Sequence, residues 1–188
     1  MNNEIKPWTE LSRRVEFEKF GRAMEKVGFK LPDGSVHDVY IKREGPAAGV
    51  VALTADKKVI ITRQYRPGPK EILYDVPGGK INEGEDHHKV AVRELLEETG
   101  YRGDFQYIGP CYYEAYSTYI MYCYVATNCQ KVAEIQEIAD DFSENEKGFV
   151  QDIEVKLISV DEFRQILRSG MSTNVELGYM GLDYLGLL

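Results

Sequence analysis

The chain has 188 residues, of which 43% are hydrophobic, enough to build the core of one domain with a small appendage. Its net charge of −8 argues against nucleic acid as the main partner. The three cysteines lack metal-ligand spacing, no apolar run reaches the length of a membrane span, and the polar N-terminus is unlike a signal peptide, so we expect a cytoplasmic protein with reduced thiols and no membrane partner.

The first 43 residues form a distinct N-terminal segment in this interpretation. Residues 36–41 alternate between apolar and polar side chains, and the turn signal Leu31-Pro32-Asp33-Gly34 precedes them. We therefore predict that residues 15–43 are mainly an antiparallel hairpin. Residues 17–27 are also compatible with a short helix.

The rest of the chain alternates strands and helices. Stretches rich in β-branched and aromatic residues predict five strands, at residues 49–53, 59–63, 105–112, 119–127 and 153–158. Residues 64–78 are expected to form a loop and a short strand. Ser159 opens a predicted helix that runs to about Arg168 and stops at Gly170, and residues 173–187 form a last amphipathic helix.

Between these strands, Glu94, Glu97 and Glu98 follow the i, i+3, i+4 spacing of one helix face. The opposite arc of this helix is apolar and consists of Ala91, Val92, Leu95, Leu96 and Thr99. Like charges at such spacing repel one another, so the acidic face needs a compensating cation. Mg²⁺, or alternatively Mn²⁺, prefers oxygen ligands of this kind.

The flanks of this helix suit a metal or phosphate site. Glu85 is expected in the first turn, where a carboxylate favours the helix dipole, and Gly100 is expected to cap the C-terminus in a left-handed conformation. Pro77-Gly78-Gly79 provides a side-chain-free approach for backbone groups. The alternative is an amphipathic surface helix whose glutamates are merely solvated.

Positions 79–101 resemble the Nudix box, in which Gly79, Glu85, Arg93, Glu94, Leu95, Glu97, Glu98 and Gly100 match the family pattern. Tyr101 departs from it by replacing the usual aliphatic residue. The resemblance covers most of residues 35–185 and implies an α/β fold, a Nudix-type α/β/α sandwich around a mixed sheet. We assign residues 44–188 to this domain.

The resemblance also implies roles for individual residues. Glu94, Glu97 and Glu98, together with the Gly78 carbonyl, would hold the metal, while Arg93 would orient the carboxylates. Glu97, Glu98 and Arg93 are accordingly expected to be catalytic. Family members often take the general base from a loop between the late strands, which corresponds here to Glu144 or Glu146, with Asp152 and Glu154 as rivals and Gln151 where a carboxylate might be expected.

The segment Arg63-Gln64-Tyr65-Arg66-Pro67 is similar to one in Nudix enzymes that act on ADP-ribose and other nucleoside diphosphate sugars. Substrate contacts are expected from Arg63, Arg66, Lys80 and Tyr116. The alternative for the two arginines is an ion pair with Glu71 or Asp75, and an unbroken strand would place them on opposite sides. Most tyrosines in the region of Tyr116 could equally belong to the core or to a dimer contact.

The resulting hypothesis is an Mg²⁺-dependent pyrophosphatase that converts a nucleoside diphosphate sugar into a nucleoside monophosphate and a sugar phosphate. Residues 112–119 replace the Ser-Pro-Gly segment usual in the ADP-ribose branch, so dinucleoside polyphosphates or nucleoside triphosphates are the alternative substrates. A non-catalytic ligand-binding Nudix domain is the third hypothesis. The resemblance further implies a homodimer that forms through the N-terminal strands.

Overall fold

The computed structural model describes residues 5–19, 21–134 and 153–188. The chain divides into two compact units. The first unit comprises residues 1–46 and 112–120, and the second comprises residues 47–111 and 121–188. Residues 112–120 therefore group with the N-terminal strands, although the sequence assigns them to the larger domain.

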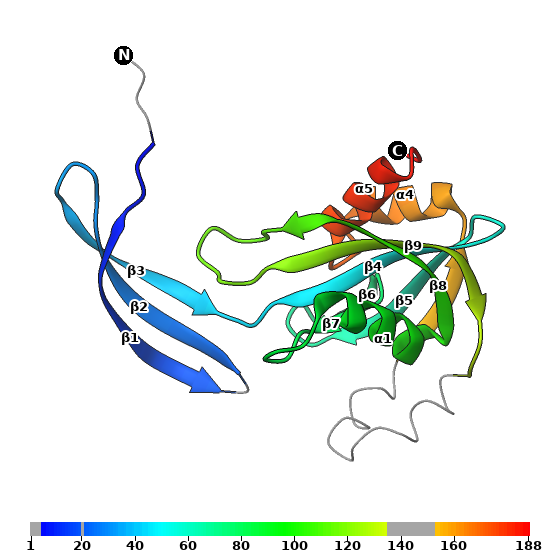
Figure 1. The fold of residues 1–188 in the computed structure, drawn as a ribbon, viewed down its shortest axis with the longest axis horizontal. Coiled ribbons are helices and arrows are strands. Elements are labelled where there is room, and N and C mark those ends of the chain that lie inside the picture. The colour runs from blue at the N-terminus through cyan, green and yellow to red at the C-terminus, as the bar shows by residue number, and fades with distance from the viewer. Residues whose placement is uncertain (1–4, 20, 135–152) are drawn as a thin grey trace. The chain divides into compact units, whose positions relative to one another are not determined.

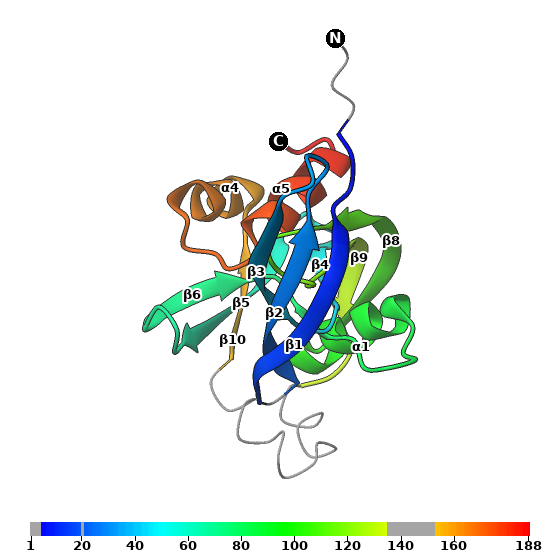
Figure 2. The ribbon, with the colours of Figure 1, turned by 90° about the vertical axis from the view of Figure 1, so that its left-hand side faces the viewer.

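The first unit is built on a three-stranded antiparallel sheet in the order β1-β2-β3, whose strands lie side by side in Figure 2. The strands are β1 (Thr9–Lys19), β2 (Arg22–Lys30) and β3 (Val36–Arg43). Gly34, with a φ of 88°, closes the turn between β2 and β3 by donating a hydrogen bond to the Leu31 carbonyl at 2.9 Å. The predicted hairpin is confirmed, and the helical alternative for residues 17–27 is wrong.

Charged side chains tie these three strands together. Glu25 on β2 is 3% exposed and lies between Arg13 on β1 and Arg43 on β3. The Arg43 Nε donates to the Glu25 carboxylate at 2.7 Å, and Arg13 donates to its other oxygen. Each arginine also pairs with a further glutamate, Glu10 or Glu18, so two guanidinium groups join three carboxylates across the sheet.

The second unit contains a seven-stranded mixed sheet, because β4 and β9 run parallel while the other pairs are antiparallel. The order is β10-β5-β4-β9-β8, with β6 also paired to β5 and β7 to β4. The strands are β4 (Ala47–Thr54), β5 (Val59–Arg66), β6 (Glu71–Asp75), β7 (Gly78–Lys80), β8 (Tyr101–Cys111), β9 (Met121–Lys131) and β10 (Glu154–Ile158). The five predicted strands are confirmed, most of them longer than expected.

Helices cover both faces of this sheet, as Figure 1 shows. Helix α1 (His87–Thr99) packs its buried residues against the sheet face that carries Ala48, Val50 and Ala52. Helices α4 (Val160–Ser169) and α5 (Val175–Tyr184) lie on the opposite face, where Gly181 of α5 rests on Val51. The predicted α/β/α sandwich is confirmed, although α5 is shorter than residues 173–187.

Two strands, β7 and β5, pair with the same edge of β4 at different positions along it. This pairing fixes β7, the strand that leads into the loop before α1. The first residues of β4 pair with β7, whereas Ala52 and Leu53 pair with β5. Gly78 of β7 lies so close to the Ala48 carbonyl that an added Cβ would meet this oxygen at 2.6 Å. Only glycine therefore permits β7 to approach β4 closely while it runs beside α1.

The three cysteines are free thiols, and Cys123 and Cys129 are buried. Burial raises the pKa of the Cys123 thiol to about 12. Of the helices in the described residues, none combines the length and the apolar character needed to cross a membrane.

Candidate active site

Helix α1 is capped at both ends, by Gly100 as predicted and by Asp86, which was not predicted from the sequence. The Asp86 carboxylate accepts hydrogen bonds from the backbone N–H groups of His88 and Lys89 at 3.1 and 3.0 Å. Gly100 adopts a φ of 78° and donates to the Leu96 carbonyl. The sequence predicts Glu85 in the first turn of the helix. Because Asp86 is the N-cap, Glu85 instead precedes the helix.

The acidic face of α1, which consists of Glu94, Glu97 and Glu98, is directed away from the core of the second unit. The buried side of the helix is formed by Val90, Ala91, Leu95 and Thr99. Glu98 accepts a hydrogen bond from the Gly78 N–H at 3.0 Å. A Cβ at Gly79 would overlap the carboxylate of Glu94, so the glycine pair of β7 lies directly against the acidic face.

Arg93 joins three carboxylates at the border of this face. Its Nη1 lies 2.9 Å from an oxygen of Glu94 and 2.8 Å from an oxygen of Glu97, and its Nε lies 3.5 Å from Glu85. Glu85 in turn accepts from the Asn82 backbone N–H at 3.1 Å. The guanidinium thus links the helix to the loop before it and fixes two of the acids.

Burial and neighbouring carboxylates raise the pKa of two acids of the site, Glu94 and Glu98. Burial raises the pKa of Glu94, and Glu97 and Glu85 add to this effect while Arg93 opposes it. The pKa of Glu98 lies well above its usual range, first because protein atoms desolvate its carboxylate, then because Glu94 and Asp75 repel its charge.

We expect Arg93→Lys to lower kcat/KM by about 10- to 100-fold, the usual cost of losing a partner that orients metal ligands. A lysine ammonium is a point charge and cannot hold Glu85, Glu94 and Glu97 at once. Steady-state kinetics and a Mg²⁺ titration of the melting temperature measure the effect. Arg102→Lys, on the exposed part of β8, is the matched control. Equal activity of the two variants would contradict the assigned role.

Of the two arginines on β5, the structure brings only Arg66 to the acidic face. Thr62 and Asp75 are paired across β5 and β6, and Arg66 lies on the same sheet face as Thr62 and α1. Arg66 donates to the Asp75 carboxylate. Its positive charge also partly offsets the raised pKa of Glu98. Asp75 is thus the ion-pair partner that the sequence left open as an alternative.

Arg63 lies on the other face of the sheet. It is paired with Glu154 across β5 and β10, with 3.3 Å between Nη1 and the carboxylate, and its guanidinium lies 5.8 Å from the centre of the Tyr74 ring. The strand continues unbroken from residue 59 to 66, so Arg63 and Arg66 point to opposite sides, as expected for an extended strand. Glu154, one rival for the general base, shares the face of Arg63.

The remaining predicted residues lie elsewhere or outside the described part of the chain. Lys80 ends β7 with its side chain exposed. Tyr116 belongs to the first unit, where it is 57% exposed and its carbonyl accepts from the Lys42 N–H at 2.8 Å. Glu144, Glu146, Gln151 and Asp152 lie outside the described residues.

Sequence reasoning gave too little weight to Asp75 and missed Asn174. Asp75 is 6% exposed, and its two carboxylate oxygens are bonded to Arg66 and to the side chain of Asn174. The available signal for Asp75 was the ion pair that the sequence offers as the alternative for Arg63 and Arg66. No local pattern indicates Asn174, because its contact with Asp75 joins segments 99 residues apart.

The donor chemistry of this site suits a divalent cation. Within the described ranges, no three or more His, Cys, Asp or Glu side chains already converge as a metal-ligand set. Glu94 and Glu98 nevertheless present carboxylate oxygens whose pKa is raised by burial and by neighbouring acids, so an added cation would stabilise their charged form. Oxygen donors of this kind fit Mg²⁺ or Mn²⁺.

Comparisons with known proteins agree with this fold. The chain is 28% identical over 130 residues to an ADP-ribose pyrophosphatase of Bacillus subtilis, covering 68% of this chain and 67% of that protein. It is 39% identical over 72 residues to a methanol dehydrogenase activator of Bacillus methanolicus, a match that spans 38% of this chain and 39% of the relative. A crystal structure described as an ADP compounds hydrolase superposes with a TM-score of 0.76 at 17% identity and covers 100% of both chains.

The family model of the NUDIX domain matches residues 43–173. This range contains the capped helix α1, the glycine pair of β7 and the acidic face that they hold. The chain therefore belongs to the NUDIX family.

Proposed function

We propose that this protein is a divalent-metal-dependent pyrophosphatase that hydrolyses the diphosphate of ADP-ribose or a similar nucleoside diphosphate sugar. The observation that carries the proposal is the placement of Arg66 on the face of the sheet that α1 covers, near enough for its charge to act on Glu98, the carboxylate that accepts from the Gly78 N–H. A phosphate-binding cation next to carboxylates that bind metal is what a diphosphate requires. The name of the Bacillus subtilis relative supports this substrate class.

The proposed metal is Mg²⁺, with Mn²⁺ as a possible substitute, and Glu94, Glu97, Glu98 and the Gly78 carbonyl are its proposed ligands. The bound metal would neutralise charge on the diphosphate oxygens and lower the pKa of the attacking water. Arg93 would keep the carboxylates oriented, and Arg66 would hold a phosphate group. Lys80 and Tyr116 remain proposed substrate contacts, whereas the pairing of Arg63 with Glu154 argues against the contact predicted for Arg63.

The general base remains a proposal that depends on residues outside the described part. Glu144 and Glu146 are the candidates, and Glu154 is disfavoured because it lies with Arg63 on the face away from α1. Single Gln substitutions at positions 144 and 146 should separate them. Substitution of the residue that acts as the base is expected to lower kcat by about 10²- to 10⁴-fold, whereas substitution of the other should leave kcat nearly unchanged.

A hydrolysis panel tests the proposed substrate class. Purified protein with Mg²⁺ is offered ADP-ribose, GDP-mannose, diadenosine polyphosphates and nucleoside triphosphates, and the products are separated by chromatography. Release of a nucleoside monophosphate and a sugar phosphate supports the proposal. Preference for a polyphosphate would favour the alternative that the tyrosines of residues 112–119 suggest. Tight binding of a sugar nucleotide without turnover would indicate a non-catalytic domain.

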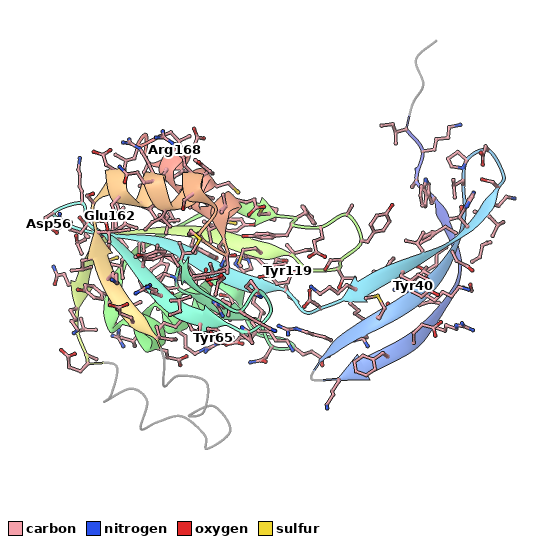
Figure 3. The ribbon with its side chains drawn as sticks, turned by 180° about the vertical axis from the view of Figure 1, so that it is seen from behind. Tyr40, Asp56, Tyr65, Tyr119, Glu162 and Arg168 are labelled. Carbon is pink, nitrogen blue, oxygen red and sulfur yellow. The ribbon has the colours of Figure 1, made fainter. Side chains whose placement is uncertain are left out.

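We further propose that residues 1–43 mediate a homodimer in the cytoplasm. Strand pairing places Phe17, Met24 and Tyr40 on one face of the first unit's sheet, together with Val36. All four are among the exposed large hydrophobic residues, and Figure 3 labels Tyr40 on β3. Lys26, Asp38 and Lys42 of the same face lie between these apolar side chains. Exposed apolar residues surrounded by charged ones are typical of a protein–protein contact.

The double substitution Phe17→Lys and Tyr40→Lys is expected to convert the dimer into a monomer, because it introduces charges at the centre of the proposed contact. Size-exclusion chromatography with light scattering measures the mass. His37→Lys is the control, since His37 lies on the opposite face of the same sheet and is also exposed. A wild-type protein that is monomeric at micromolar concentration would contradict the proposal.

A further inference from the structure

Asp75 closes β6 at the acidic side of the sheet and is bonded on both oxygens. Its Oδ2 accepts from Nη2 of Arg66, and its Oδ1 accepts from the amide of Asn174. Its backbone carbonyl accepts from the Thr62 hydroxyl at 3.2 Å. The two side-chain bonds fix the carboxylate in one orientation, and the partners of Asp75 come from two segments, β5 and the start of α5.

A negative charge at this position is unfavourable for the fold by itself. Asp75 is 6% exposed, and it repels the nearby carboxylate of Glu98. A neutral Asn of the same shape would avoid the repulsion and the cost of burying a charge. What only the charged carboxylate provides is a strong, directional bond to the guanidinium of Arg66.

Asn174 shows a similar departure from the locally favoured arrangement. It is the N-cap of α5, yet its side chain makes no capping hydrogen bond to that helix. Its amide donates instead to Asp75, although asparagine is among the preferred capping residues. Residues that give up a local role in this way are often found at functional sites.

Arg66 is the group on which this arrangement converges. Its side chain remains 37% exposed although Asp75 binds it from one side. Its Nε is buried and has no hydrogen-bond acceptor among the described residues, so only the exposed part of the side chain can meet a ligand. The guanidinium is therefore held in place while part of its donor capacity stays available to a ligand.

We propose that Asp75 is a positioning residue: anchored by Asn174, it holds the guanidinium of Arg66 ready to bind a phosphate group of the substrate. This inference rests on the proposed function, because it takes the diphosphate as the group that Arg66 binds. Fixing the arginine in advance removes the entropic cost of ordering it when the substrate arrives. Asp75 itself touches no substrate atom in this arrangement.

A double-mutant cycle tests the proposal with ADP-ribose and Mg²⁺. Asp75→Asn should lower kcat/KM about tenfold, largely through KM, and Asn174→Ala should act in the same direction with a smaller effect. In an Arg66→Ala background, Asp75→Asn should change kcat/KM by less than about twofold, because the residue acts only through Arg66. Asp75→Glu, which keeps the charge, should retain more activity than Asp75→Asn.

Glu71→Gln is the matched control, since Glu71 is the exposed carboxylate directly opposite Arg66 in the β5–β6 pair. It should leave kcat/KM within about twofold of the wild type. Melting temperatures of all variants separate misfolding from loss of positioning, and Arg66→Lys replaces Arg66→Ala in the cycle if the latter does not fold. If the double variant lost kcat/KM by the product of the two single losses, Asp75 would act independently of Arg66 and the proposal would be overturned.

A second readout separates this inference from the proposed function. Inorganic pyrophosphate with Mg²⁺ serves as the probe, and its affinity is measured by calorimetry for the same four members of the cycle. If wild-type protein does not hydrolyse ADP-ribose but binds pyrophosphate with the predicted coupling between Asp75 and Arg66, the proposed function fails and the positioning role stands. If neither ligand shows a contribution from Arg66, the positioning role is wrong.

Discussion

Glu98→Gln is expected to lower kcat by about a thousandfold, because Glu98 is a proposed metal ligand and a bound metal supplies several kcal/mol of charge stabilisation. The same substitution should raise the melting temperature of the metal-free protein. Glu98 is crowded by Glu94 and Asp75, and its pKa is raised by burial and by these two charges. A neutral side chain of equal length can keep the acceptor oxygen for the Gly78 N–H without the repulsion.

The pH dependence of stability gives this prediction a second measurement. A carboxyl group whose folded-state pKa lies above its unfolded-state value contributes stability at low pH, and this contribution is lost as the pH rises through the folded-state pKa. The gain in melting temperature from Glu98→Gln should therefore be larger at pH 8 than at pH 5. Differential scanning calorimetry without metal measures both values.

Glu83→Gln is the control for Glu98→Gln, because Glu83 is an exposed carboxylate in the loop before α1. It should change neither kcat nor the melting temperature noticeably. Full turnover by Glu98→Gln would remove the basis of the proposed active site. A lower melting temperature would show that the charge of Glu98 stabilises the fold, contrary to the direction of its pKa.

Gly79→Ala is expected to lower kcat/KM by about 100-fold, since displacement of a catalytic group by about 1 Å already has an effect of this size. An added Cβ would overlap the carboxylate of Glu94, which must then move away from its present position. The change introduces no charge and removes no functional group. Steady-state kinetics and a Mg²⁺ titration measure the loss.

Gly68→Ala is the matched control, because a Cβ at Gly68 meets no atom within 4 Å. This variant should retain wild-type activity and slightly higher stability, as its unfolded chain has less conformational freedom. If Gly79→Ala were as active as Gly68→Ala, Glu94 would not need its present position for catalysis.

The helix that carries the site was predictable because its signals are local. Spacing alone places Glu94, Glu97 and Glu98 on one face, and the C-cap of α1 follows from Gly100, whereas the N-cap Asp86 was not predicted. Strand periodicity likewise separates Arg63 from Arg66, although it does not say which of them faces α1. Tyr101, the departure from the box pattern, is buried in the core beneath α1 and so affects packing alone.

The contacts that the sequence did not reveal join distant segments. The pairing of Asp75 with Asn174 depends on where the N-terminus of α5 lies against the sheet, and the periodicity of neither segment encodes this position. The grouping of residues 112–120 with the N-terminal strands likewise depends on backbone hydrogen bonds between Lys42 and the segment that contains Tyr116 and Thr118. Such contacts are long-range in the chain, so local propensity carries no information about them.

The parallel pairing of β4 with β9 has a consequence for the way the chain is made. Residues 47–54 find their parallel neighbour only when residues 121–129 have left the ribosome, and α1 is synthesised in between. During that interval the apolar side of α1 and the central strand are only partly covered. Non-local pairing of this kind slows folding and exposes nascent chains to aggregation. We therefore expect chaperones to bind the nascent chain from the synthesis of α1 until β9 has been added.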